Sequence, residues 1–142
     1  MHRLVLVALC LLILPVAAQA QRDARVDDFL GFTRCENGVA VTELRADLRD
    51  SALLDEVHAH EEVHRAQSAR FATCEAFLAS ITTARQVIEV ELPAYCAQWR
   101  IAVLRGADSA TTRLEYAWRI AAQSGAMENR LGVAQRFELE CR

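Results

Sequence analysis

Residues 60–64 read H-E-x-x-H, and the pattern restricts the fold because its two histidines are spaced to share a metal ion when the segment is a helix. Histidines four positions apart lie on one helical face, so the imidazoles of His60 and His64 can reach a single ion. Glu61 would lie beside the open position of the metal, where a carboxylate can take a proton from a zinc-bound water. The motif therefore predicts a metal-site helix and calls for a second element that supplies another ligand.

The N-terminus has the form of a secretory signal. Met1-His2-Arg3 is a short basic start, residues 4–16 are an apolar run too short to span a bilayer comfortably, and Ala18-Gln19-Ala20 fits the small-x-small cleavage rule. We expect residues 1–20 to be removed as a signal peptide and residues 21–142 to form one exported domain, periplasmic or secreted, with no membrane association after cleavage.

Four cysteines remain after the expected cleavage: Cys35, Cys74, Cys96 and Cys141. An even number in an oxidising compartment predicts two disulfides, for which three connectivities are open. The chain has no lysine, and its arginines are interspersed with a slight excess of acidic residues. Without a basic stripe, nucleic acid is a poor candidate partner.

Turn and cap signals outline the first elements of this domain. The segment 38–44 is rich in β-branched residues, follows Asn37-Gly38, and predicts a strand or half of a hairpin. Asp50 or Ser51 can cap the next helix. That helix should present a stripe of residues at helical spacing, namely Leu53, Leu54, Val57, His60, Glu61, His64 and Phe71.

Three further helices complete the predicted fold. Thr83 and Gln86 fit a capping box for a helix toward Arg105, which Pro93 would either kink or start. Asp108 can cap a helix through Gln123, and Ser124-Gly125 marks a turn. The last helix should bury Met127, Leu131, Ala134 and Phe137. The expected fold class is α+β and helix-dominated, with a short strand or hairpin, a metal-site helix, a second site helix and two C-terminal helices.

A catalytic zinc usually has three protein ligands and a water, so a third ligand is needed after His64. Glu91 opens the segment Glu91-Leu92-Pro93-Ala94-Tyr95, which has the form E-x-x-A-Y. Together with H-E-x-x-H, this segment resembles the gluzincins, zinc peptidases in which a glutamate from a second helix completes the metal site. The resemblance implies a minimal zincin-like domain in which His60, His64 and Glu91 hold Zn²⁺ and Glu61 is the general base.

Neighbouring residues leave alternatives open. Glu89 points about 200° away from Glu91 on a helix, so only one of them can face the metal, and the E-x-x-A-Y context favours Glu91. Tyr95, one turn after Glu91, could bond a ligand carboxylate or donate to an oxyanion, or could simply be a half-buried tyrosine. His58 lies about 200° around the helix from His60 and is expected at the surface.

The sequence thus predicts an exported zinc-dependent peptidase that hydrolyses protein or peptidoglycan-peptide bonds, with strand 38–44 offering its edge to an extended substrate. The alternative is a non-catalytic exported metal-binding or inhibitor/immunity-type interaction domain stapled by two disulfides. Glu61 favours the peptidase, because a structural metal site has no use for a base. Substrate identity and oligomeric state stay open.

The metal site also restricts the disulfides. If the two site helices are antiparallel and meet at the metal, Cys74 and Cys96 run in opposite directions from it, at about 1.5 Å per residue. They would then lie roughly 20 Å apart, beyond the limit of about 7 Å between bridged Cα atoms. Each should therefore bond Cys35 or Cys141.

Overall fold

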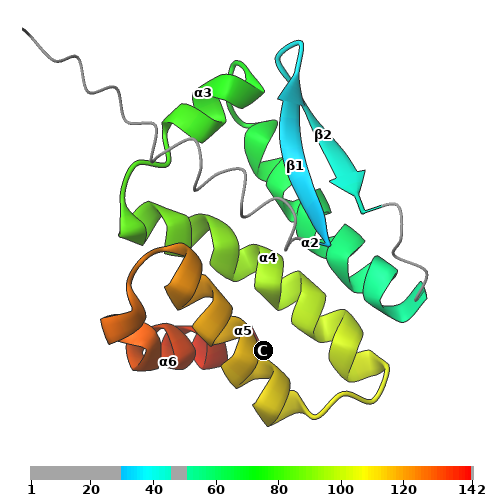
Figure 1. Cartoon of the computed structure of the whole chain (residues 1–142), viewed down its shortest axis with the longest axis vertical. Helices are drawn as coiled ribbons and strands as arrows, with labels where there is room; N and C mark the ends of the chain where they lie inside the picture. The colour runs from blue at the N-terminus through cyan, green and yellow to red at the C-terminus, as the bar shows by residue number, and fades with distance from the viewer. Residues whose placement is uncertain (1–29, 46–50, 142) are drawn as a thin grey trace, which may run out of the picture.

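The computed structural model describes residues 30–45 and 51–141, so the expected signal peptide and the candidate cap Asp50 lie outside the described residues. The described part folds into a two-stranded hairpin and five α-helices (Figure 1). The elements are β1 (Gly31–Glu36), β2 (Val39–Leu44), α2 (Ser51–Ser68), α3 (Cys74–Ala79), α4 (Ala84–Leu104), α5 (Ser109–Gln123), a 3₁₀ turn (Met127–Asn129) and α6 (Arg130–Glu140). This confirms the helix-dominated α+β fold. None of the described helices is long and apolar enough to cross a membrane.

A two-residue turn sets the hairpin. Asn37 and Gly38 have φ angles of 52° and 82°. This is the left-handed backbone that a type I′ turn needs and that Asn-Gly adopts most readily. The strands then pair in an antiparallel register that places Gly31 opposite Leu44. The strand predicted within residues 38–44 is confirmed, with Gly38 in the turn.

Helices α2 and α4 run side by side in opposite directions (Figure 1). Toward one end, Asp55 of α2 pairs with Arg105, the residue that follows α4. Toward the other end, Gln67 of α2 donates to the backbone carbonyl of Val90 at 2.9 Å. Contacts in this reversed order establish the antiparallel arrangement on which the disulfide argument depended.

Helix α4 begins at its predicted capping box. The Thr83 side chain accepts a bond from the backbone N–H of Gln86, and the Gln86 side chain accepts one from the backbone N–H of Thr83. The helix is continuous through Pro93, which therefore does not start it. Pro93 is exposed, so solvent can reach the backbone carbonyl of Glu89 that loses its donor.

Helix α2 ends before Phe71, the last residue of the predicted buried stripe. Val57, His60, Glu61 and His64 do form its buried face, but the helix stops at Ser68. Phe71 lies beyond it, 42% exposed, and the prediction that it continues the stripe is wrong.

The main apolar core lies between α4, α5 and α6. Leu92, Ile120, Val133 and Phe137 are each at most 1% exposed. Helix α5 starts at its predicted cap, where Asp108 accepts a bond of 2.7 Å from the backbone N–H of Thr111. Packing against α5 and α6 in this core holds α4 in place beside α2.

The predicted apolar face of α6 is partly wrong. Phe137 is buried and Ala134 packs against the core, but Met127 and Leu131 are 43% and 68% exposed. Met127 belongs to the 3₁₀ turn before the helix, so the face of α6 is set by Phe137 and by Val133 one turn earlier.

The two disulfides are Cys35–Cys74, with Cα atoms 5.5 Å apart, and Cys96–Cys141, with Cα atoms 5.1 Å apart. The prediction that Cys74 and Cys96 do not pair with each other is confirmed. One bond joins β1 to the start of α3, a short helix distinct from α2, and the other joins the end of α6 to α4.

Candidate metal centre

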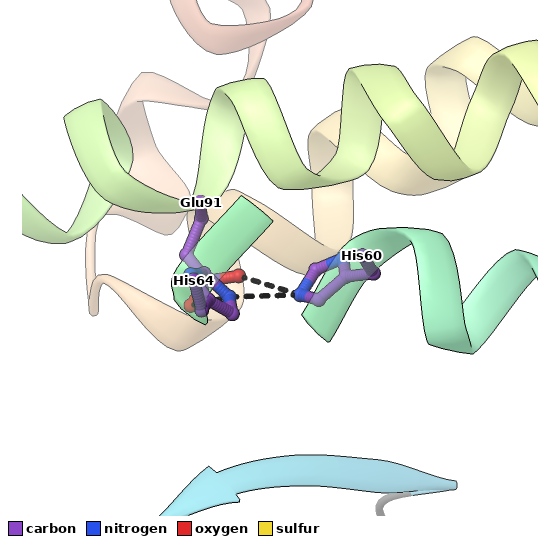
Figure 2. Close-up of side chains that lie close together, drawn as sticks. All are labelled: His60, His64 and Glu91. Atoms are coloured by element: carbon purple, nitrogen blue, oxygen red, sulfur yellow. Dashed lines mark hydrogen bonds and ion pairs between the residues drawn. The ribbon is translucent and has the colours of Figure 1, made fainter. Parts of the chain in front are cut away.

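The two histidines of the motif and Glu91 converge at the interface between α2 and α4 (Figure 2). His60 and His64 are each 8% exposed, and their Nε2 atoms lie 3.0 Å apart. From α4, the two oxygens of Glu91 approach them: Oε2 lies 3.4 Å from His60 Nε2, and Oε1 lies 3.6 Å from His64 Nε2. The structure thus brings together the three residues proposed as ligands.

The spacing of these atoms fits a small divalent ion. Bonds of about 2.0–2.1 Å in a tetrahedron place neighbouring ligand atoms roughly 3.3–3.4 Å apart. The separations of 3.0, 3.4 and 3.6 Å lie around that value, and all candidate ligand atoms of the group fall within 4.8 Å of one another. His60, His64 and Glu91 could therefore hold a metal ion with small side-chain shifts.

Electrostatics favour an ionised glutamate in this cluster. Burial raises the pKa of Glu91, but the two imidazoles beside it outweigh burial and bring the pKa down to about 2. Burial lowers the pKa of His64, yet Glu91 and the side chain of Gln67 outweigh that effect and raise it. A buried carboxylate between two histidines is the charge arrangement that a bound cation would stabilise further.

The competing acidic and basic residues point elsewhere. Glu89 forms an exposed ion pair of 2.8 Å with Arg85, so the choice of Glu91 over Glu89 agrees with the geometry. His58 is exposed and lies 3.9 Å from Glu62, outside the cluster. Glu89 and His58 thus point away from the cluster, as expected for residues two positions from Glu91 and His60 on a helix.

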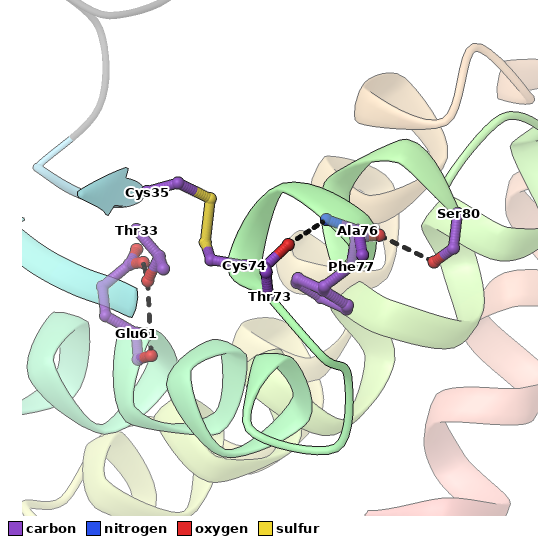
Figure 3. The surroundings of a disulfide bond; sticks show 8 residues. All are labelled: Thr33, Cys35, Glu61, Thr73, Cys74, Ala76, Phe77 and Ser80. Carbon is purple, nitrogen blue, oxygen red and sulfur yellow. Dashed lines mark hydrogen bonds between the residues drawn. A yellow bond between two sulfur atoms is a disulfide. The ribbon is translucent and has the colours of Figure 1, made fainter. Parts of the chain in front are cut away.

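Glu61 of the motif is bonded to the hairpin through Thr33 (Figure 3). It is 4% exposed, and the hydroxyl of Thr33 on β1 donates a bond of 2.8 Å to its Oε2. The same hydroxyl lies 3.4 Å from the backbone carbonyl of Glu61. Sequence reasoning missed Thr33, because only the second strand of the hairpin was identified.

Gln67 is a second contact that sequence reasoning did not assign. Its Oε1 lies 3.0 Å from His64 Nδ1, and its Nε2 donates to the Val90 carbonyl. The spacing of three residues from His64 on one helix is a signal that could have indicated it.

Tyr95 packs against the first histidine. It is 5% exposed, and its ring meets the His60 imidazole edge-on with centroids 4.5 Å apart. Its hydroxyl accepts a bond of 3.2 Å from Gln123 on α5. Burial and the nearby Glu91 raise its pKa, so the phenol stays neutral. A role for this hydroxyl in catalysis stays a prediction.

A cavity of about 740 Å³ adjoins the cluster and Glu61. Apolar side chains form much of its wall, among them Phe32, Val57 and Phe77, and Arg119 contributes a cation on the α5 side. The sequence assigned the substrate-facing edge to strand 38–44, but within the hairpin it is β1 that lines the cavity. β1 is also the strand that Cys35–Cys74 joins to α3, whose residues Phe77 and Leu78 line the same cavity.

The chain matches no family model, no curated protein and no solved structure. Its function is therefore inferred from the site's own geometry.

Proposed function

We propose that the protein is an exported zinc-dependent peptidase of gluzincin type. The observation that carries the proposal is the conjunction of a three-residue ligand cluster with a separate buried carboxylate, Glu61, at the wall of one cavity. Three protein ligands leave a coordination position open, which distinguishes a catalytic zinc site from a closed structural one.

Two imidazoles and one carboxylate are a ligand set of catalytic zinc sites, and zinc is the metal that we propose for this one. When bound by His60, His64 and Glu91, it would act as a Lewis acid that polarises a peptide carbonyl and makes water acidic near neutral pH. Zn²⁺ has no redox chemistry, so hydrolysis is the reaction class that fits a zinc ion held by these ligands.

Glu61 accepts the proton of the attacking water and passes it to the leaving amine. One of its oxygens, Oε2, is occupied by the Thr33 hydroxyl. The other oxygen, Oε1, is left for proton transfer. Burial and this bond hold the carboxylate in one orientation, which keeps the base near the reacting atoms.

An extended peptide can bind along β1. The backbone N–H of Arg45 bonds the carbonyl of Leu30, and hydrogen-bonded pairs alternate along antiparallel strands. The backbone groups of Gly31 and Thr33 therefore point away from β2, and both residues line the cavity. A substrate strand could pair with this edge while its apolar side chains contact the cavity wall.

Export is part of the proposal. The structure has two disulfides, each joining segments far apart in the sequence. Disulfides form and persist mainly in oxidising compartments. The sequence of residues 1–20 supplies the signal that such a route requires.

The test replaces Glu61 by Gln in the mature protein and measures zinc content and hydrolysis of a mixed peptide library by mass spectrometry. We predict retained zinc and loss of nearly all cleavage, because Gln cannot accept a proton and Glu61 is not a ligand. Glu62→Gln, an adjacent change at a half-buried residue that pairs with Arg65 outside the cluster, should leave cleavage intact.

Cleavage at the wild-type rate by the Glu61→Gln protein would exclude Glu61 from the mechanism. A zinc-loaded wild-type protein that cleaves no peptide would instead favour the non-catalytic metal-binding or interaction domain.

A further inference from the structure

Gln67 connects the two helices that carry the candidate ligands. Its amide nitrogen donates to the Val90 carbonyl of α4 at 2.9 Å, and its amide oxygen lies 3.0 Å from His64 Nδ1 on α2. Val90 directly precedes Glu91, so this one side chain contacts a ligand on α2 and the backbone beside a ligand on α4. The residue is partly buried, so water competes weakly for these bonds.

The chemistry of these contacts determines where the proton of His64 resides. A backbone carbonyl can only accept, so the NH₂ group of Gln67 must face Val90. The amide oxygen, an acceptor, must then face His64, and Nδ1 must carry the hydrogen that it accepts. In the neutral imidazole, Nε2 is then left with its lone pair, directed toward His60 and Glu91.

His60 provides the contrast within the same site. Its Nδ1 is buried and has no hydrogen-bond partner among the described residues. When both rings are neutral, the lone pair of His64 Nε2 faces His60 Nε2 at 3.0 Å, so His60 carries its hydrogen on Nε2. His64 is therefore the histidine whose Nε2 can bind a metal without first losing a hydrogen.

We propose that Gln67 is a positioning residue that holds His64 as the Nδ1–H tautomer, so that its Nε2 is prepared to bind the metal before the metal arrives. The inference rests on the proposed metal centre but not on peptidase activity. Positioning of this kind is typically worth about 10–100-fold in metal affinity.

Zinc affinity of the mature protein, measured by competition with a chromophoric chelator, tests the first consequence. Gln67→Leu removes the acceptor and should weaken zinc binding about 10–100-fold. Gln67→Glu keeps an acceptor for Nδ1–H and should remain closer to the wild type than Gln67→Leu does. Gln135→Leu, an exposed change on α6, is the matched control and should bind as the wild type does. Equal affinity of Gln67→Leu and the wild type, or equal losses in Gln67→Leu and Gln67→Glu, would overturn the proposal.

A second measurement needs neither metal nor activity. Long-range ¹⁵N–¹H spectra of the metal-free wild-type protein, recorded above the pH at which the His64 ring signals stop changing, report the tautomer of the neutral ring directly. We expect His64 to be protonated on Nδ1, and Gln67→Leu to lose this preference. Protonation of His64 on Nε2 in the wild type would refute the inference while leaving the zinc peptidase proposal intact. A wild type that binds zinc with His64 protonated on Nδ1 but cleaves no peptide would refute the peptidase proposal alone.

Discussion

The hydroxyl of Thr33 contributes to the site from a different element than any proposed ligand. It donates to Oε2 of Glu61 from the hairpin, whereas Glu61 itself is fixed to α2. A carboxylate on a flexible side chain has several orientations, and only those that direct Oε1 toward the reacting water support proton transfer. The orientation of Glu61, the proposed base, therefore depends on a residue 28 positions away in sequence.

Replacing Thr33 by Val should lower kcat roughly 10–100-fold, because small displacements of a catalytic group are costly. Zinc content should not change, since Thr33 does not contact the ligand atoms. Thr33→Ser retains the hydroxyl and should recover most of the rate. Steady-state kinetics with parallel metal analysis make the measurement, and an undiminished kcat for Thr33→Val would show that the bond does not position the base.

At this scale, the sequence predicted which candidate ligands come together, because their spacing encodes their geometry. His60 and His64 are one helical turn apart, and Glu89 and Glu91 point to opposite sides of α4, as helical rotation requires. The contacts of Thr33 and Gln123 with the site could not be predicted. These residues belong to β1 and α5, and nothing in the sequence indicates how those elements pack against α2 and α4.

The start of a helix was predictable where a side chain caps it. The capping box at Thr83 and the cap at Asp108 both form, since a side-chain oxygen placed before an apolar repeat has a local partner. The end of α2 and the face of α6 were misjudged because they are decided by packing: Phe71 and Leu131 are exposed although their spacing suited burial. The sequence offered 38–44 as half of a hairpin, but it did not place the other half, which the structure shows to be β1.

Replacing Thr83 by Ala should lower the free energy of unfolding by about 1 kcal/mol, the usual contribution of an N-cap hydroxyl. The change removes the acceptor for the Gln86 N–H at the start of the helix that carries Glu91. Urea denaturation provides the value, with Thr83→Ser as the control that keeps the hydroxyl. Equal stabilities of Thr83→Ala and wild type would mean that the capping box does not stabilise α4.

Across the whole molecule, the two disulfides hold different parts of the fold. Cys96–Cys141 closes the α4–α6 core, and Cys35–Cys74 joins the hairpin, with Thr33 two residues away, to α3. Their sequence separations of 45 and 39 residues correspond to roughly 4 kcal/mol each in the chain-entropy model.

Peptide mapping of the non-reduced protein should recover these two crosslinks. Paired Cys→Ala replacement at either bond should lower the free energy of unfolding by about 2–4 kcal/mol. The Cys35/Cys74 pair should in addition lower kcat, because the strand that carries Thr33 loses its attachment, whereas the Cys96/Cys141 pair should leave kcat near wild type below its melting temperature. A Cys74–Cys96 crosslink, or equal kcat for both double variants, would contradict this division.

Metal analysis of the mature protein is the most direct test of the central claim, that His60, His64 and Glu91 bind zinc. After incubation with zinc and gel filtration, we predict one zinc per chain for the wild type by inductively coupled plasma mass spectrometry. Glu91→Gln should lose most of it, and the matched variant Glu89→Gln, two residues away on the exposed side of α4, should retain it. A wild type that holds no zinc, or a Glu91→Gln protein that holds it as tightly as Glu89→Gln, would contradict the account.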